Sequence, residues 1–313
     1  MSNFDTHIVH ATPVYPELDA KVNYTSPSAP ALSQIYPQDI IINYPGIPVD
    51  SMDRFRNLVE KYSISMEFAM RLRELDGYEI VVILDDSGSM SSPVSKPNDP
   101  FVKTETRWQE AQRSAKIIVD IASVFDPDGV DIYYLNRSPI LNVHDENELD
   151  SNPIFSRYPD GSTPLGETIE RVLNGKSKCE RKLLLIVFTD GQPDNMKLFK
   201  SVLANRKPID KIFVSLVACT DDSNAVGYLN EIDKTIKNVD TNDDYFSELH
   251  EIKQVQGPGF PFTFGDYICK ILLGPVCPHF DKLDERKLTV RDLGAIKQKP
   301  KPTINNKDSC IVS

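Results

Sequence analysis

The sequence predicts an α/β protein with a doubly wound, mostly parallel sheet flanked by helices. Between residues 77 and 275, short apolar runs alternate with segments of helical period, which is the pattern of strands linked by crossover helices. Several of these runs are almost free of polar residues, as expected for strands that helices cover on both faces. The 313 residues and 40% apolar composition suffice for one core of domain size with additional tails.

The chain divides into four predicted segments. Residues 1–50 hold seven prolines and no apolar period, which predicts an extended, disordered tail. Residues 51–76 are a predicted helical lead-in, a single helix over about 50–75 that Asp76-Gly77 ends. The α/β domain follows over 77–275. Residues 276–313 form a predicted basic and disordered C-terminal tail, polar from about Asp281 onward.

Inside the α/β segment, each element is expected from its own pattern. The β-branched run 78–84 predicts a buried first strand, and 107–125 predicts a helix with Ala111, Ala115 and Ile118 on one side. The later expected strands are 130–135, 140–143, 183–188 and 211–218, and the later expected helices are 165–173, 195–205, 225–236 and 264–272. Trp108 is expected to pack, and the acidic run 240–244 to form a solvated turn.

Three polar clusters coincide with the ends of these elements. They are Asp85-Asp86-Ser87-Gly88-Ser89-Met90, the 161–166 segment that contains Thr163, and Thr189-Asp190-Gly191. In an open parallel sheet, ligands bind beyond the carboxyl ends of the strands, so these clusters can meet there. They supply carboxylate and hydroxyl oxygens, which Mg²⁺ prefers, and no His or Cys pair lies nearby to favour zinc. The alternative is that they are ordinary loop residues that cap helices.

Asp85-x-Ser87-x-Ser89, Thr163 and Thr189-Asp190-Gly191 together resemble the metal-ion-dependent adhesion site of von Willebrand factor A-type (vWA) domains, which have a Rossmann-like fold. The resemblance covers roughly residues 78–272. It implies that Ser87, Ser89 and Thr163 coordinate one Mg²⁺ or Mn²⁺ directly. It also implies that Asp85 and Asp190 act directly or through water, and that a protein partner supplies a further acidic ligand. Asp86 could support the ligands from behind or be solvated, and we expect it to be solvated.

Charge and cysteine usage exclude several other classes of function. A formal net charge of −11 argues against a nucleic-acid binder, which needs clustered Lys and Arg. Five cysteines without a C-x-x-C pair fit free thiols in a reducing compartment. The first ten residues lack a secretory pattern, and the apolar runs are too short to span a bilayer. We therefore expect a cytoplasmic protein.

The last four residues, Cys310-Ile311-Val312-Ser313, match the C-a-a-X prenylation pattern, with a serine that favours farnesyl. Lysines precede this motif at 297, 299, 301 and 307. One lipid chain anchors a protein only marginally, so a basic segment would strengthen attachment to an anionic leaflet. Cys310 is therefore the predicted lipidation site of a protein held peripherally at a cytoplasmic membrane face.

Two short motifs stand in the proline-rich tail. Pro27-Ser28-Ala29-Pro30 resembles the P-S/T-A-P motif, and Tyr15-Pro16-Glu17-Leu18 resembles Y-P-x-L. The resemblance implies docking of the first to the ubiquitin-variant domain of the first ESCRT complex, and of the second to an ESCRT-associated V-domain adaptor. Proline holds such peptides extended, which lowers the entropy lost on binding. The predicted partner-binding residues of the two motifs are Tyr15, Pro16, Leu18, Pro27, Ser28, Ala29 and Pro30.

Three functions remain open from the sequence. The favoured one is a non-catalytic, Mg²⁺-dependent protein-binding adaptor. A metal-dependent phosphoesterase would use Asp85 or Asp86 as nucleophile, but no positioned base or phosphate-binding cation stands out near these loops. A soluble vWA subunit of a ubiquitin ligase or another complex is the third, although no RING-type cysteine pattern is present.

Overall fold

The computed structural model describes residues 49–94, 105–220, 222–289 and 292. The N-terminal motifs and Cys310 therefore lie outside the described residues, and the functions assigned to them stay predictions. None of the helices in the described part of the chain has the length and apolar character needed to span a bilayer.

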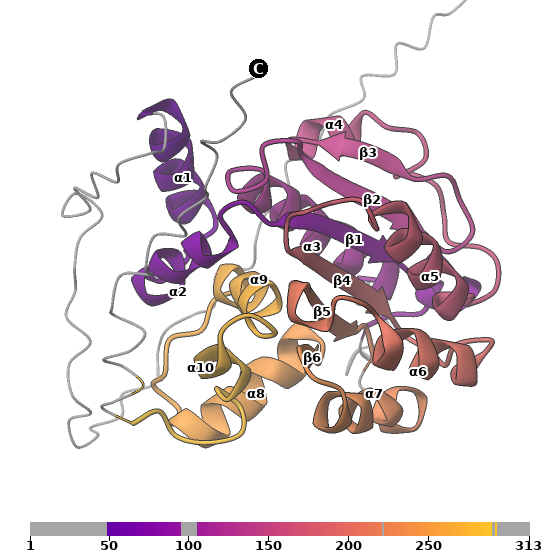
Figure 1. Ribbon diagram of the computed structural model, residues 1–313. Helices are drawn as coiled ribbons and strands as arrows, with labels where there is room; N and C mark the ends of the chain where they lie inside the picture. The colour runs from indigo at the N-terminus through magenta and orange to yellow at the C-terminus, as the bar shows by residue number, and fades with distance from the viewer. Residues whose placement is uncertain (1–48, 95–104, 221, 290–291, 293–313) are drawn as a thin grey trace, which may run out of the picture. The chain divides into compact units, whose positions relative to one another are not determined.

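Six strands form one sheet in the order β3-β2-β1-β4-β5-β6, and all neighbours are parallel except β2 and β3. This confirms the predicted α/β class and its mostly parallel sheet (Figure 1). The strand order reverses between β1 and β4, where ligand sites of open α/β sheets occur. The strands are β1 (Glu79–Leu84), β2 (Val130–Tyr134), β3 (Ile140–Val143), β4 (Leu183–Thr189), β5 (Ile212–Ala218) and β6 (Val239–Asn242).

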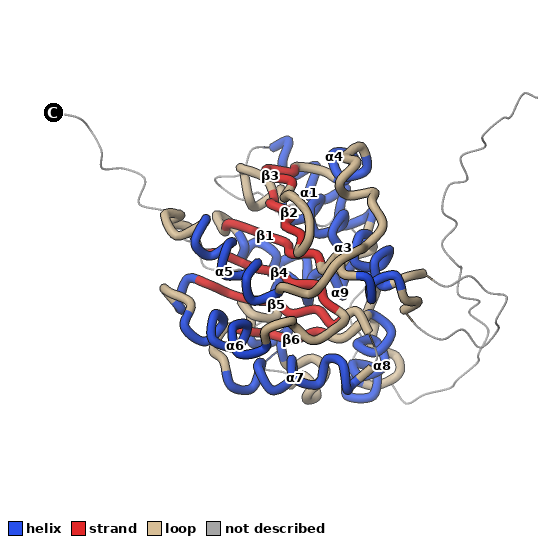
Figure 2. Tube along the Cα trace, turned by 90° about the vertical axis from the view of Figure 1, so that its right-hand side faces the viewer, coloured by secondary structure: helices blue, strands red, loops and turns tan. Residues whose placement is uncertain are grey.

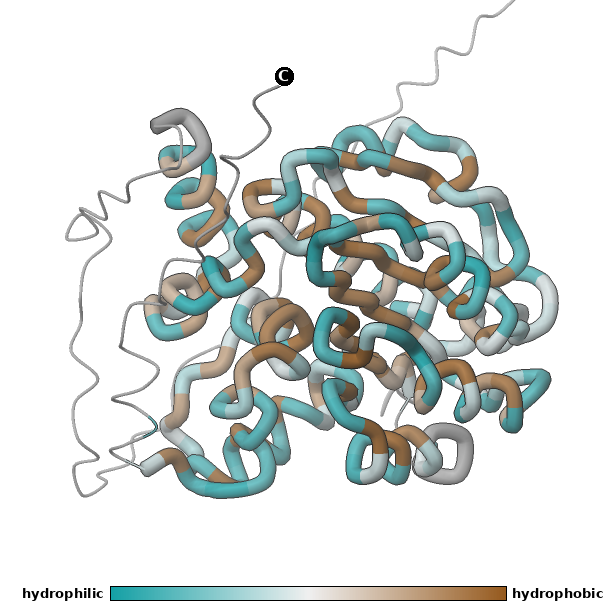
Figure 3. Tube along the Cα trace, in the orientation of Figure 1, coloured by the Kyte–Doolittle hydropathy of each residue, from teal (hydrophilic) through white to brown (hydrophobic). Residues whose placement is uncertain are grey.

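Helices cover both faces of the sheet, so each central strand is buried along its whole length (Figure 2). One face packs on α5 (Leu165–Gly175), α6 (Met196–Asn205) and α7 (Ser223–Thr235). The other packs on α3 (Arg107–Ala122), α9 (Phe264–Leu273) and shorter segments. Alternate residues of β1 point to the two cores, Val81 to the first and Val82 to the second. Figure 3 shows the hydrophobic colouring concentrated on the strands and the inner sides of helices.

The predicted single helix over 50–75 is wrong in detail. It is divided into α1 (Val49–Lys61), α2 (Met66–Arg71) and the short η2 (Leu72–Leu75). Ser63 breaks the helix with a φ of 52°, which a helix cannot contain. The break lets the segment dock on α9: the Ser65 N–H donates to Asp266 Oδ1 at 2.7 Å, and Thr263 Oγ1 donates to the Ser63 carbonyl at 3.0 Å.

The predicted solvated turn at 240–244 is also wrong. Residues 239–242 form β6, in which Asp240 and Asn242 are buried. The cause is Lys270 of α9, which is fully buried, donates to Asn242 Oδ1 at 3.0 Å and pairs with Glu248 at 2.8 Å. A buried cation needs such partners, and they hold this polar segment inside.

Five further helical segments had no sequence prediction. They are η3 (Gly88–Ser91), α4 (Glu146–Asp150), η4 (Ile209–Lys211), α8 (Tyr245–Gln256) and α10 (Pro278–Asp281). Phe280 of α10 and the following Leu283 are each 1% exposed. Packed residues therefore continue beyond position 275.

Candidate metal centre

Two neighbouring strands place the acidic residues of the candidate site. Asp85 directly follows β1, and its N–H donates to the Phe188 carbonyl of β4 at 3.0 Å, which extends the pairing of the two strands. Thr189 ends β4, and Asp190 comes next. The parallel register therefore sets Asp85 and Asp190 at the same edge, at the reversal of strand order.

Four of the five predicted ligands belong to one hydrogen-bonded cluster. Ser89 lies in the one-turn η3 (Gly88–Ser91), and its hydroxyl donates to Asp190 Oδ1 at 2.7 Å. The Ser87 and Ser89 hydroxyl oxygens are 3.1 Å apart. The Ser87 N–H donates to Asp85 Oδ1 at 2.9 Å. Two carboxylates and two hydroxyls are thereby gathered by a short turn.

Thr163 lies next to this cluster but is held through its backbone. Its N–H donates to Asp194 Oδ2 at 3.1 Å, and its carbonyl accepts from the Asp194 N–H at 3.0 Å. The Gly88 N–H donates to the Gly161 carbonyl at 3.3 Å, so the two loops are adjacent. Within the described residues, no hydrogen bond joins the Thr163 hydroxyl to the other four residues.

Asp85 is buried and oriented by its neighbours. Thr189 Oγ1 donates to Asp85 Oδ2 at 2.7 Å, while the Ser87 N–H holds the other oxygen. Burial raises the pKa of Asp85 to about 6, and the hydrogen bonds from Ser87 and Thr189 oppose that rise. A buried carboxylate beside hydroxyl oxygens fits a hard divalent cation, which would relieve the cost of burying the charge.

Arg107 is a component of the site that the sequence analysis missed. Its Nη1 lies 2.7 Å from Asp190 Oδ2, and the Asp190 side chain is fully buried. Arg107 is the first residue of α3, where a positive charge is unfavourable to the helix dipole. A positive charge at the start of a predicted helix could therefore have indicated an acidic partner for Arg107.

The expectation that Asp86 is solvated is wrong. Asp86 is fully buried, and its Oδ1 accepts from the Asn136 N–H at 2.8 Å and from Asn136 Nδ2 at 3.1 Å. Arg137 Nε lies 2.8 Å from Asp86 Oδ2. Asp86 is therefore bound to the segment that follows β2, while its neighbour Asp85 is bound to the turn from Ser87 to Ser89, which we call the serine turn.

Acidic groups also meet at two other places in the described part of the chain. Glu79, Asp126 and Asp128 offer ligand atoms within 4.8 Å of one another and could hold a metal, as could the triad of Asp233, Asp240 and Asp281. In the first triad, however, Arg181 contacts all three carboxylates, at 2.6 Å for Asp126 and 2.8 Å for Asp128. Arg181, together with Lys176 on Glu79, already offsets most of the negative charge of that triad, so it is the weaker candidate for a metal ion.

No family is identified by comparison with known proteins. No family model matches the sequence, and a search of curated proteins finds no match. Among solved structures, the chain is similar to a mutant of the PilB minor pilin from Streptococcus sanguinis, with a TM-score of 0.42 and 10% sequence identity. The match covers 67% of this chain and 62% of that one. Values this low give no functional conclusion, and the fold class stands on the strand order itself.

Proposed function

We propose that this chain is a non-catalytic adaptor with a vWA-type domain that binds a protein partner through one divalent ion, Mg²⁺ or Mn²⁺. The observation that carries this proposal is the hydrogen-bonded cluster of Asp85, Ser87, Ser89 and Asp190 at the reversal of strand order. The order of the three polar segments, which resembles that of vWA domains, supports it.

In this proposal, the hydroxyls of Ser87, Ser89 and Thr163 coordinate the ion, and Asp85 and Asp190 balance its charge directly or through water. The bound ion supplies a Lewis-acid position that an acidic residue of the partner fills. Thr189 and the Ser87 N–H keep the Asp85 carboxylate in place. Arg107 offsets part of the Asp190 charge, which leaves the ion more electrophilic toward the partner's acid.

The contacts of the two aspartates favour this function over a phosphoesterase. A nucleophilic carboxylate needs a free oxygen facing the substrate. Each Asp85 oxygen accepts one hydrogen bond, and its remaining lone pairs are those that the proposal assigns to the ion, while the fully buried Asp86 is bound to Asn136 and Arg137. A phosphatase assay of the purified protein with Mg²⁺ separates the two functions, since the adaptor should show no turnover above the Asp85→Ala variant. The third candidate function is a soluble vWA subunit of a ubiquitin ligase or another complex. It would use the same metal site and differ from the adaptor only in its partner.

Proximity labelling in cells tests the adaptor directly. The native protein, Asp85→Ala and the exposed control Asp210→Ala are each fused to the labelling enzyme. A set of partners should be labelled by the native protein and by Asp210→Ala and be lost with Asp85→Ala. Identical partner sets for all three proteins would contradict a metal-dependent adaptor.

We also propose that a farnesyl group on Cys310, with the preceding lysines, holds the adaptor at a cytoplasmic membrane face. This rests on the C-I-V-S sequence alone. Cys310→Ser should then move the protein from the membrane to the soluble fraction. An unmodified Cys310 found by mass spectrometry in a farnesylating host would contradict it.

The tail motifs support a further proposal, recruitment of ESCRT-type adaptors through Tyr15, Pro16 and Leu18 and through Pro27 to Pro30. Two weak motifs on one tail gain affinity from effective concentration. Residues 1–50 should pull down both candidate domains. Binding that survives Pro27→Leu with Pro30→Leu, and Tyr15→Ala with Leu18→Ala, would show that the motifs are not used.

A further inference from the structure

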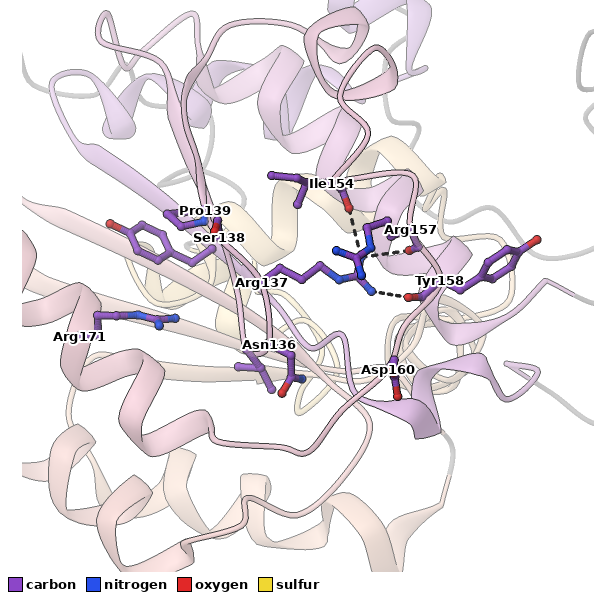
Figure 4. A pocket seen from close by; sticks show the side chains of 11 residues that line it. Asn136, Arg137, Ser138, Pro139, Ile154, Arg157, Tyr158, Asp160 and Arg171 are labelled. Atoms are coloured by element: carbon purple, nitrogen blue, oxygen red, sulfur yellow. Dashed lines mark hydrogen bonds between the residues drawn. The ribbon is translucent and has the colours of Figure 1, made fainter.

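A cavity of about 690 Å³ lies between the end of β2, the loop that precedes Thr163 and helix α5 (Figure 4). We call it the arginine pocket, because three arginines line it. Arg137 follows β2, Arg157 lies in the 151–164 loop, and Arg171 reaches in from α5. Other lining residues are Asn136, Ile154 and Asp160.

Arg137 builds the wall of the pocket and is not available to a ligand. Its guanidinium donates to the carbonyls of Ile154 at 3.1 Å and Arg157 at 3.0 Å, and also to that of Tyr158. It pairs with buried Asp86 through Nε, and its side chain is only 6% exposed. Figure 4 shows these bonds crossing to the loop backbone. The pocket is thus held open by a residue whose own charge is compensated.

The remaining charges of the pocket favour an anion. Arg157 and Arg171 are both exposed. Arg171 Nη2 donates to the Tyr134 carbonyl at 3.1 Å and to Thr168 Oγ1. No protein partner for the Arg157 guanidinium occurs within the described residues, and only Asp160 adds a carboxylate to the lining. The pocket therefore offers two available guanidiniums and one carboxylate. Its local charge is positive, although the chain has a net charge of −11.

The pocket adjoins the candidate metal centre. The Asp160 N–H donates to the Asp86 carbonyl at 2.7 Å, and Asn136 Nδ2 donates to the Ser162 carbonyl at 2.9 Å. Ser162 precedes the predicted ligand Thr163, and Asp86 lies between Asp85 and Ser87. A ligand that spans this edge of the sheet can therefore reach both places.

We propose that the arginine pocket binds an acidic segment of the protein partner, whose carboxylates pair with Arg157 and Arg171. This rests on the proposed adaptor function and names the chemistry of its partner: one acidic residue at the metal and further acidic residues in the pocket. Guanidinium groups bind carboxylates through paired, charge-assisted hydrogen bonds. Tyr158, 89% exposed on the same loop, supplies an aromatic rim of the kind that anchors protein interfaces.

The test uses a fluorescein-labelled peptide of alternating glutamate and glycine, with a glutamine–glycine peptide as the neutral probe. Fluorescence anisotropy is measured with the full chain at about 50 mM salt, where screening of surface charges is weak. The native protein should bind only the glutamate peptide. Arg157→Glu with Arg171→Glu should weaken binding by about tenfold or more, the effect of losing a charge-assisted pair.

The matched control is Lys234→Glu with Lys253→Glu, two exposed lysines outside the pocket lining with the same change of charge. The proposal is overturned if the control variant weakens peptide binding equally, or if the pocket variant does not weaken it. It is also overturned if the native protein binds both peptides equally or binds neither. Arg157→Glu alone serves if the double variant does not fold. The same peptide titrations in EDTA distinguish this proposal from that of the metal centre. The pocket should bind the glutamate peptide in EDTA, because it needs no metal ion. If Mg²⁺ does not change the binding, only the proposed metal centre is contradicted.

Discussion

Arg107 and Asp190 form an ion pair within the candidate site. The guanidinium lies 2.7 Å from one Asp190 oxygen, and the Ser89 hydroxyl lies 2.7 Å from the other. Removing the guanidinium leaves a buried carboxylate without its counter-charge, which a divalent ion can compensate. In the proposed site, Arg107 therefore competes with the metal ion for Asp190.

Arg107→Gln should tighten Mg²⁺ binding by about tenfold in calorimetry, equivalent to ~1.4 kcal/mol. The matched control is Arg113→Gln on the same helix, whose partner is Glu105 at 2.9 Å and not a predicted ligand. Arg113→Gln should leave the affinity unchanged. Weaker Mg²⁺ binding in Arg107→Gln would instead show that Arg107 supports the site and does not compete for it.

Glu110 makes stability depend on pH. It is buried on α3, and burial raises its pKa to about 7 from an ordinary value of 4.5, with Arg113 opposing the rise. The folded state therefore holds the proton more tightly than the unfolded state. The contribution of Glu110 to the free energy of unfolding is most favourable below pH 4.5 and falls as the pH rises toward 7. Above pH 7, the folded state bears the full cost of burying the ionised carboxylate.

Glu110→Gln should consequently raise the free energy of unfolding at pH 8 by roughly 1–3 kcal/mol and change it little at pH 4.5. Urea denaturation at both pH values measures this. The exposed Glu60→Gln serves as control and should alter neither value. A loss of stability at pH 8 in Glu110→Gln would mean that the ionised carboxylate has a favourable partner.

At the residue scale, the sequence predicted which residue types gather but not all of their partners. Asp85, Ser87, Ser89 and Asp190 meet because each follows or ends an element whose place the apolar pattern predicts. The pairing of Asp190 with Arg107, 83 positions away, leaves no periodic trace in the sequence. The burial of Asp86 depends in the same way on Arg137, a contact between two loops.

At the element scale, a close approach between α9 and the N-terminal helices fixes the break after α1. A Cβ atom on Gly265 would overlap the Tyr62 carbonyl oxygen and come within 3.0 Å of Ile64 Cγ1. Only glycine lets this helix meet the backbone so closely. The lead-in is thereby packed into the same core as the sheet, with Phe55 and Phe68 among its buried residues.

Gly265→Ala should lower the free energy of unfolding by about 1–3 kcal/mol, because the overlap forces α9 and the Tyr62 backbone apart. Gly175→Ala at the end of α5, where a Cβ meets nothing within 4 Å, is the control. Chemical denaturation of both variants gives the comparison. Equal stability of Gly265→Ala and the native protein would contradict the packing of the lead-in on α9.

Elements with an apolar signature could be predicted to within a few residues, and polar ones could not. The strand over 140–143 and the start of the helix at Phe264 match the sequence prediction. β6, with the sequence Val-Asp-Thr-Asn, reads as a turn because its burial depends on Lys270 from a distant helix. Tertiary contacts of this kind override local propensity.

At the scale of the whole molecule, three features share one edge of the sheet. The strand order reverses there, the serine turn gathers two carboxylates there, and the arginine pocket adjoins it. The serine turn follows β1, and one wall of the pocket follows β2. In the two proposals, an acidic partner would meet a bound cation and two guanidiniums on one surface of a chain whose net charge is −11.

In the proposed metal centre, Asp85 and Asp190 hold one divalent ion. Isothermal titration calorimetry with Mg²⁺ on the native protein, Asp85→Ala and Asp190→Ala measures it, with circular dichroism to confirm that the variants fold. The native protein should show a single site and Asp190→Ala a severe loss of binding, with Ca²⁺ competing poorly because a compact hydroxyl-rich site suits the smaller ion. Unchanged Mg²⁺ binding in both variants would contradict the claim.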